Sequence, residues 1–158
     1  MTNRFLIGVA ALLVTAWGMT TAADAGESGT LKGESRGVST SSTFVNGQGQ
    51  TIIQFSNKQV FHYESPDGPV MVAGEAVGMG LVEADGTYAG GKGYFTARIS
   101  EEDSYDAEFI DHALGGIFVI TGGSGRWKGA KSTNGIYTYL FNDGERFAYT
   151  YSFDYTIP

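Results

Sequence analysis

Apolar and polar residues alternate along the last segment of the chain, residues 145–156. Its aromatic positions are Phe147, Tyr149, Tyr151, Phe153 and Tyr155. A period of two residues is typical of a β-strand, because successive side chains point to opposite faces of a sheet. Residues 136–141 repeat the pattern, and Asp143-Gly144 between the two segments is a turn signal. We therefore predict a hairpin of two aromatic strands.

The same signals predict strands along most of the chain. No segment after residue 25 sustains apolar residues at helical spacing, whereas β-rich runs alternate with glycine, asparagine and aspartate turns. Eight strands are predicted, at residues 35–45, 51–63, 70–83, 86–99, 104–112, 116–121, 126–141 and 145–156. Residues 26–33 are predicted to be a loose lead-in. The predicted fold class is all-β.

Glycine is frequent, with 24 of 158 residues, about twice its usual share of roughly 7%. Gly74, Gly78 and Gly80 share one face of the third predicted strand, where missing side chains permit curvature or close approach of another segment. Curved antiparallel strands without a covering helix are best satisfied by closing into a barrel, which removes exposed edges. We predict an eight-stranded antiparallel up-and-down β-barrel, with a β-sandwich as the alternative.

The first 25 residues have a different pattern. Arg4 precedes an apolar run at residues 5–17, and an Ala-Asp-Ala triplet ends the segment with the small residues that signal peptidases recognise. The run is too short to cross a bilayer core, which needs roughly 20 helical residues. We predict that residues 1–25 are a cleaved secretory signal peptide, that residues 26–158 form a single domain, and that the protein is secreted or periplasmic.

Composition excludes several classes of partner and chemistry. The formal net charge is −7 at pH 7 and the chain has no basic run. Nucleic acids and anionic membrane surfaces are bound through clustered Lys and Arg, so neither is a predicted partner. The chain has no cysteine, which excludes disulfides, cysteine-ligated iron–sulfur clusters, thiol catalysis and a lipid-modified cysteine. No membrane span is predicted after processing.

Three motifs resemble ligand sites, but a role without a ligand explains each of them better. Residues 122–125, Gly-Gly-Ser-Gly, lack the Gly-Lys-Ser/Thr continuation of a phosphate loop and are predicted to form a tight turn. The acidic residues between 101 and 111 lack the spacing of a calcium loop and are predicted to be solvated. His62 and His112 each have a carboxylate nearby, but nothing in the sequence brings them together. We predict no metal site and no cofactor.

Residues 85–155 resemble the dirigent protein and allene oxide cyclase superfamily. The resemblance is strongest at 118–130, FVITGGSGRWKGA, an apolar strand followed by a glycine-rich turn, an aromatic residue and small residues. Residues 136–139 and 149–155 are similar to the last two strands of that superfamily. The resemblance implies a calycin-like eight-stranded barrel in an exported protein, a pocket for a hydrophobic or phenolic small molecule, cyclisation or coupling guided by the pocket's shape, and a homotrimer.

Glu75, Arg98 and Lys131 are the candidate catalytic residues. Glu75 shares a strand face with apolar residues, and an acid there is costly unless it is paired. If that face points into the barrel, Glu75 could act as a general acid or base on a bound substrate. Pairing with Arg98 on the next strand, as a buried structural pair, is the alternative. The resemblance places Lys131 where dirigent proteins carry a functional arginine.

The aromatic residues of the last hairpin are the candidate ligand-binding residues. Stacked tyrosines suit a ring-shaped apolar ligand, and plain core packing is the alternative. The predicted set is Tyr137, Tyr139, Phe147, Tyr149, Tyr151 and Phe153. The leading hypothesis is a cofactor-free cyclase, isomerase or dirigent-type coupling guide that holds one reactive conformer in a dry pocket. The alternatives are a non-catalytic carrier of a lipid-like or aromatic ligand, and an exported structural protein with a filled barrel.

Overall fold

The computed structural model describes residues 26–65 and 68–158, which form one antiparallel sheet of nine strands. The predicted signal peptide, residues 1–25, lies outside the described residues. The strands are β1 (Glu27–Val45), β2 (Thr51–Ser65), β3 (Gly68–Val82), β4 (Tyr88–Arg98), β5 (Ser104–His112), β6 (Gly115–Ser124), β7 (Lys131–Ser132), β8 (Gly135–Asn142) and β9 (Arg146–Ile157). One turn of 3-10 helix, η1 (Gly125–Trp127), precedes β7. None of the described residues forms a helix long and apolar enough to cross a membrane.

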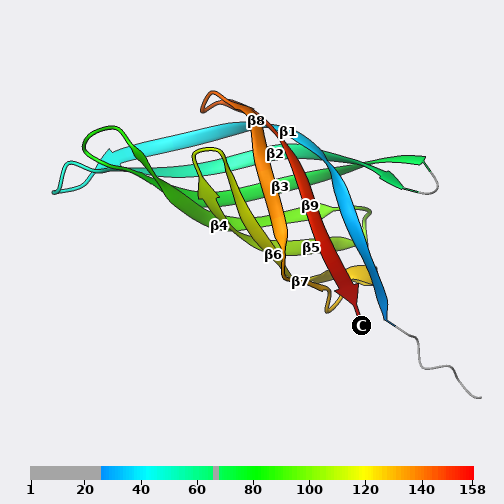
Figure 1. Ribbon diagram of the computed structural model, residues 1–158. Helices are drawn as coiled ribbons and strands as arrows, with labels where there is room; N and C mark the ends of the chain where they lie inside the picture. Colours follow the sequence, from blue (N-terminus) through cyan, green and yellow to red (C-terminus); the bar gives the residue numbers. More distant parts are fainter. Residues whose placement is uncertain (1–25, 66–67) are drawn as a thin grey trace, which may run out of the picture.

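Pairing of the first strand with the last closes the sheet into a barrel (Figure 1). Neighbours follow the chain from β1 to β6, then β8 and β9, and β9 pairs with β1 from Glu27↔Ile157 to Val38↔Arg146. The two-residue β7 pairs with β9 near its carboxyl end and is an extra strand. The predicted all-β fold and its closed eight-stranded antiparallel barrel are therefore confirmed.

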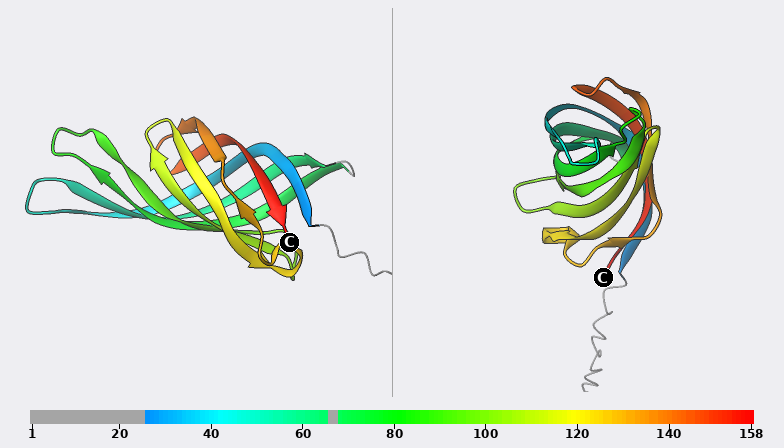
Figure 2. Two further views of the ribbon diagram at one scale, coloured as in Figure 1. Left: turned by 60° about the horizontal axis from the view of Figure 1, so that its bottom comes forward. Right: turned by 90° about the vertical axis from the view of Figure 1, so that its left-hand side faces the viewer.

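Four strands continue beyond one end of the barrel as an arm, which we define as residues 39–55 and 79–90 (Figure 2). The arm exists because the β1–β9 pairing ends at Val38, whereas β1 and β2 stay paired as far as Val45↔Thr51. At the tip of the arm, the side-chain amide of Gln50 donates a hydrogen bond of 2.8 Å to Glu83. This bond joins the β1–β2 hairpin to the β3–β4 hairpin.

The lead-in predicted at residues 26–33 is instead the first part of β1, so that prediction was wrong. The segment is polar and glycine-rich, and it forms a strand because its backbone pairs with that of β9. Side chains add to this pairing at the start of the strand. Arg126 Nη2 lies 2.5 Å from Glu27 Oε2, and the Tyr155 hydroxyl donates a hydrogen bond of 3.1 Å to Glu27 Oε1.

The single strand predicted at 126–141 is also wrong, because η1, β7 and β8 occupy this segment. The chain turns at Gly125 and Gly129, which have positive φ angles of 54° and 78°. The turn carries the Trp127 ring into one end of the barrel, where its centroid lies 4.8 Å from that of Tyr105 and 5.1 Å from that of Tyr155. Trp127 therefore closes this end.

The inside of the barrel is one aromatic core. Its largest buried rings come from five strands and from η1, and they are Phe61, Phe95, Tyr105, Phe118, Trp127, Tyr151 and Phe153. The glycines of β3 share one face, as predicted, and the structure shows that this face points at aromatic rings inside the barrel. A Cβ atom at Gly78 would lie 2.5 Å from the ring of Phe55, and one at Gly80 would lie 2.9 Å from the ring of Tyr88. Glycine is required there because the aromatic rings occupy the space.

Replacement of Gly33 tests whether the corrected part of β1 belongs to the barrel. A Cβ atom there would meet the backbone oxygen of His62 and would lie 2.7 Å from the Tyr151 hydroxyl. We expect Gly33→Ala to lower the free energy of unfolding in urea by about 1–3 kcal/mol. Gly122→Ala is the matched control, because nothing lies within 4 Å of its Cβ position, and its effect should stay within about 0.5 kcal/mol. Equal effects would contradict the packing of this segment.

Candidate ligand-binding site

Most of the barrel interior is filled by side chains. The gap between the core rings measures about 50 Å³ and is bordered by aromatic residues of β2, β4, β5, β6, β8 and β9. One water molecule needs about 10–15 Å³ of such space, whereas a cavity that accepts benzene measures about 150 Å³. The centre of the barrel therefore has room for a few water molecules and not for a ring-shaped ligand.

A larger hollow lies at the end of the barrel opposite Trp127, between the arm and the β5–β6 and β8–β9 turns. We call it the mouth hollow. Its volume is about 350 Å³. It is lined by Ser39, Ser41, Ile53, Phe55, Asn57, Tyr88, Asp111, His112, Ala113, Tyr139, Asn142, Gly144 and Phe147. Four of these residues contribute aromatic rings, so the hollow combines an apolar wall with a few polar groups.

The carboxylate of Asp111 lies buried at the wall of the mouth hollow, with 7% of the residue exposed. Three tyrosine hydroxyls donate hydrogen bonds to it. Tyr88 donates to Oδ2 at 2.9 Å, while Tyr137 and Tyr139 donate to Oδ1 at 2.7 and 3.2 Å. These bonds join β4, β5 and β8 around one charge. The prediction that the acidic residues between 101 and 111 are solvated is therefore wrong for Asp111.

The geometry of β5 and of the start of β4 explains how this cluster forms. Asp111 is in register with Tyr105, Ala107 and Phe109, so the period of β5 carries it to the inside. Tyr88 begins β4, where Gly90 has a positive φ of 120° and the β3–β4 register shifts. The alternation along 105–111 was the signal in the sequence that could have placed Asp111 inside. The acidic character of its neighbours concealed that signal.

Burial and the Asp111 charge keep the three tyrosines protonated. Burial raises the pKa of Tyr88, Tyr137 and Tyr139, and the negative charge of Asp111 and the hydrogen bonds to it raise these pKa values further. Burial also raises the pKa of Tyr149. All four hydroxyls therefore act as hydrogen-bond donors at neutral pH and are poor sources of a proton.

Hydrogen-bond acceptors remain in the mouth hollow after these bonds are counted. A carboxylate has about four acceptor positions, and the Asp111 carboxylate uses three of them, with only one bond on Oδ2. The Oδ1 atom of Asn57 is buried and has no hydrogen-bond partner among the described residues. The nearby Gln59 differs, since its Oε1 accepts a hydrogen bond of 2.8 Å from the Tyr149 hydroxyl.

The three predicted catalytic residues all lie on the outer surface of the barrel. Glu75 and Arg98 are exposed, on the faces of β3 and β4 opposite the core, and Lys131 is exposed on β7. The condition under which Glu75 was expected to act, an inward-facing apolar strand face, is therefore not met. Glu75 and Arg98 border one shallow outer depression, but no ion pair joins them among the residues described. None of the three lines the mouth hollow.

The six predicted ligand-binding aromatics all point into the barrel, but only two of them reach the mouth hollow. Tyr139 and Phe147 line it. The other four, Tyr137, Tyr149, Tyr151 and Phe153, pack among the core rings around the small central gap. The neighbouring Phe141 is 50% exposed, because a bulge between Tyr139 and Phe141 shifts the register of β8 against β9. Sequence reasoning missed Tyr88, Asn57 and Asp111.

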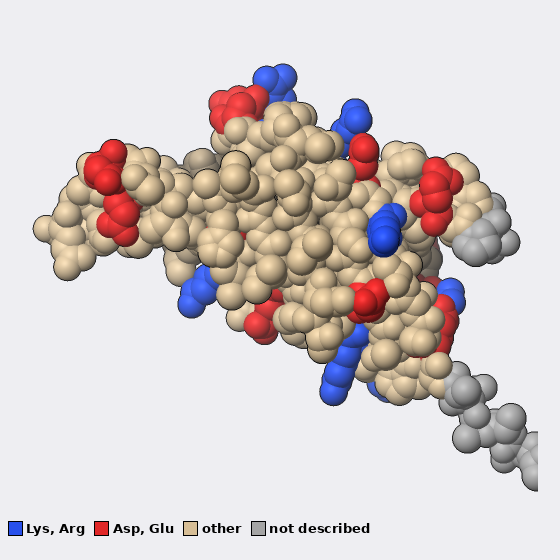
Figure 3. Space-filling model, viewed as in Figure 1, with Lys and Arg blue, Asp and Glu red and all other residues tan. Residues whose placement is uncertain are grey.

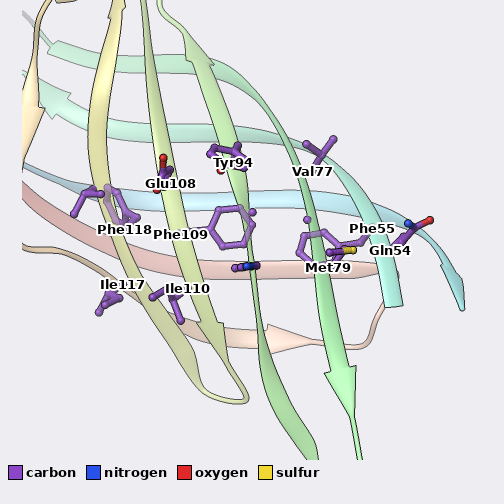
Figure 4. Close-up of a pocket in the computed structure, with 14 residues that line it drawn as sticks. Gln54, Phe55, Val77, Met79, Tyr94, Glu108, Phe109, Ile110, Ile117 and Phe118 are labelled. Atoms are coloured by element: carbon purple, nitrogen blue, oxygen red, sulfur yellow. The ribbon is translucent and has the colours of Figure 1, made fainter. Parts of the chain in front are cut away.

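A second depression of about 640 Å³ lies over the outer surface of β2 to β6, and we call it the outer groove (Figure 4). Its exposed apolar residues are Val77, Met79, Tyr94, Ile110, Ile117 and Val119. The strand register places them in two adjacent rows, one including Val77↔Tyr94 and the other Ile110↔Ile117. Lys92 and Glu108 are the charged residues of the groove.

The charged side chains in Figure 3 are spread over the surface and leave much of the face in view uncharged. Comparison of the chain with models of known protein families finds no match, and comparison with curated protein sequences finds none either. The resemblance to the dirigent protein and allene oxide cyclase superfamily stays a prediction.

The raised tyrosine pKa values predict a loss of stability at alkaline pH. Unfolded tyrosines ionise near pH 10, whereas Tyr88, Tyr137, Tyr139 and Tyr149 hold their protons longer in the folded state. Their contribution is therefore fully present below about pH 10 and is lost as the pH rises further. Urea unfolding at pH 8, 10 and 11 measures this fall, and Tyr137→Phe should make it shallower. An unchanged slope in the variant would contradict the assignment.

Proposed function

We propose that this protein is an exported carrier that binds a small hydrophobic or phenolic molecule in the mouth hollow. The observation that carries the proposal is a hollow of about 350 Å³ with aromatic walls, a buried carboxylate and an amide oxygen that has no partner among the described residues. Small-molecule sites are mostly apolar cavities of about 300–1,000 Å³ with a few polar groups that orient the ligand. Export is proposed from the pattern of residues 1–25.

Carriage is favoured over conversion because of where the acid and base groups lie. Glu75, Arg98 and Lys131 are exposed on the outside of the barrel and do not line the hollow. Asp111 does line it, but three tyrosine hydroxyls already donate to its carboxylate. These bonds leave the carboxylate one acceptor position, on Oδ2, which can orient a bound ligand. Cofactor-free cyclisation, isomerisation or coupling, which the family resemblance implies, is the alternative.

Occlusion of the hollow tests the binding proposal. Ser41 lines the hollow, and the next residue, Ser42, does not. Because side chains alternate along a strand, Ser41→Trp should fill the hollow, whereas Ser42→Trp places the same ring on the opposite face of β1. We expect Ser41→Trp to weaken the binding of 2-phenylethanol, measured by calorimetry, at least tenfold, and Ser42→Trp to leave it unchanged. Equal binding by both variants would move the ligand site away from the hollow.

We also propose that copies of this chain associate through the outer groove, as the homotrimer that the family resemblance implies. The supporting observation is the extent of exposed apolar surface, with Tyr94 62%, Val77 56% and Ile117 52% exposed. Exposed apolar residues that gather on one face mark protein interaction sites. In this groove Lys92 lies between Met79 and Ile110, and Glu108 lies between Tyr94 and Val119. Contact between copies would remove this surface from water and would leave the mouth hollow at the barrel end uncovered.

Native mass spectrometry of the exported protein tests both the assembly and the export signal. We expect a trimer whose subunits begin at Gly26. Ile117→Lys should convert the trimer to monomers, because it replaces an apolar contact residue of the groove by a charged one. Val60→Lys is the matched control, since Val60 is 41% exposed on the outer surface and does not line the groove. A trimer that survives Ile117→Lys would exclude the groove as the interface.

A further inference from the structure

Within the described part of the chain, Asp111 is a buried charge without a cationic partner. Among the described residues, the ion pairs are Arg36–Glu34, His62–Glu64, Arg126–Glu27 and Arg146–Asp143, and none includes Asp111. Tyrosine hydroxyls solvate the carboxylate but bring no positive charge. A buried carboxylate that is hydrogen-bonded and not neutralised leaves a negative potential in the space beside it. That space is the mouth hollow.

The aromatic walls of the hollow also favour a positively charged ligand. Phe55, Tyr88, Tyr139 and Phe147 line it with aromatic rings. The face of an aromatic ring is negative, so rings around a small cavity attract an organic cation, and this attraction is stronger when the cation is shielded from water. His112 is the only other residue of the lining that can carry a charge, and it is exposed at the rim.

Two buried acceptors at the wall of the hollow complete the match. Asp111 keeps one acceptor position on Oδ2, and Asn57 presents a buried Oδ1 with no partner among the described residues. Both groups accept hydrogen bonds. An alkylammonium group carries three donors and no acceptor, whereas a carboxylate ligand would bring only acceptors and a second negative charge.

We propose that the mouth hollow selects a small arylalkyl ammonium cation, with its ammonium group on Asp111 and Asn57 and its apolar part against the aromatic walls. This inference rests on the proposed function, since it names the class of ligand for the same site. The proposed function names a hydrophobic or phenolic ligand, and this inference adds that the ligand carries a positive charge. The net charge of −7 favours approach of such a cation over that of an anion.

Three probes of nearly equal size test the charge requirement, namely phenethylamine, 2-phenylethanol and phenylacetate. They share one ring and a two-carbon chain or its carboxylate equivalent, and at pH 7 they are a cation, a neutral alcohol and an anion. We expect calorimetry to give phenethylamine an affinity at least tenfold higher than that of 2-phenylethanol, and phenylacetate no measurable binding. Equal affinities for amine and alcohol would overturn the inference and leave the proposed function standing. No binding by any probe would overturn both.

Removal of the charge gives a second test. Asp111→Asn keeps a side-chain oxygen and removes the negative charge, so phenethylamine should bind no better than 2-phenylethanol, whose own affinity should change little. Asp106→Asn is the matched control on the same strand, because Asp106 is exposed on the outer face and accepts a hydrogen bond from Thr96. A retained preference for the amine in Asp111→Asn would overturn the inference. If that variant does not fold, the three-probe comparison decides it.

Discussion

The volume available inside the barrel constrains the rest of this structure. Aromatic side chains from β2, β5 and β9 would not fit in the closed eight-stranded barrel if the positions beside them on the adjacent strands carried ordinary side chains. Glycines at inward positions of β1, β3 and β4 make room for them. The rings and the glycines pack so closely that only about 50 Å³ remains between the rings. Among the described residues, the larger space lies at the end of the barrel where this packing stops, in the mouth hollow.

Much of the fold could be predicted from the sequence, because alternation is strong where side chains decide pairing. β9 is the best case, because its pattern predicted that the aromatic residues share one face and that Asp154 lies on the other, and the structure places the aromatic face inside. The start of β1 could not be predicted this way, since its pairing with β9 depends on backbone groups, and Leu31 is its one large buried apolar side chain. The break near Trp127 was missed for a different reason, because Gly129 was not recognised as a second turn after the one that ends at Gly125.

The candidate site was harder to predict because apolar residues lie on both faces of several strands. On β3, Val72 points into the core while Val77 and Met79 are exposed on the outside. The apolar neighbours of Glu75 therefore could not reveal which face was inside. Asp111 presents the converse difficulty. Its charge suggests an exposed side chain, whereas the two-residue period of β5 places it inside. In both cases the closure of the barrel, and not local composition, decides the outcome.

The pairing of Glu27 with Ile157 brings the two ends of the described chain together at the end closed by Trp127. The opening of the barrel therefore faces away from both termini. A tether or a fused domain at either end would leave that opening unobstructed. A short linker between Pro158 and Gly26 would also permit circular permutation, with new termini at the exposed Asp143-Gly144 turn.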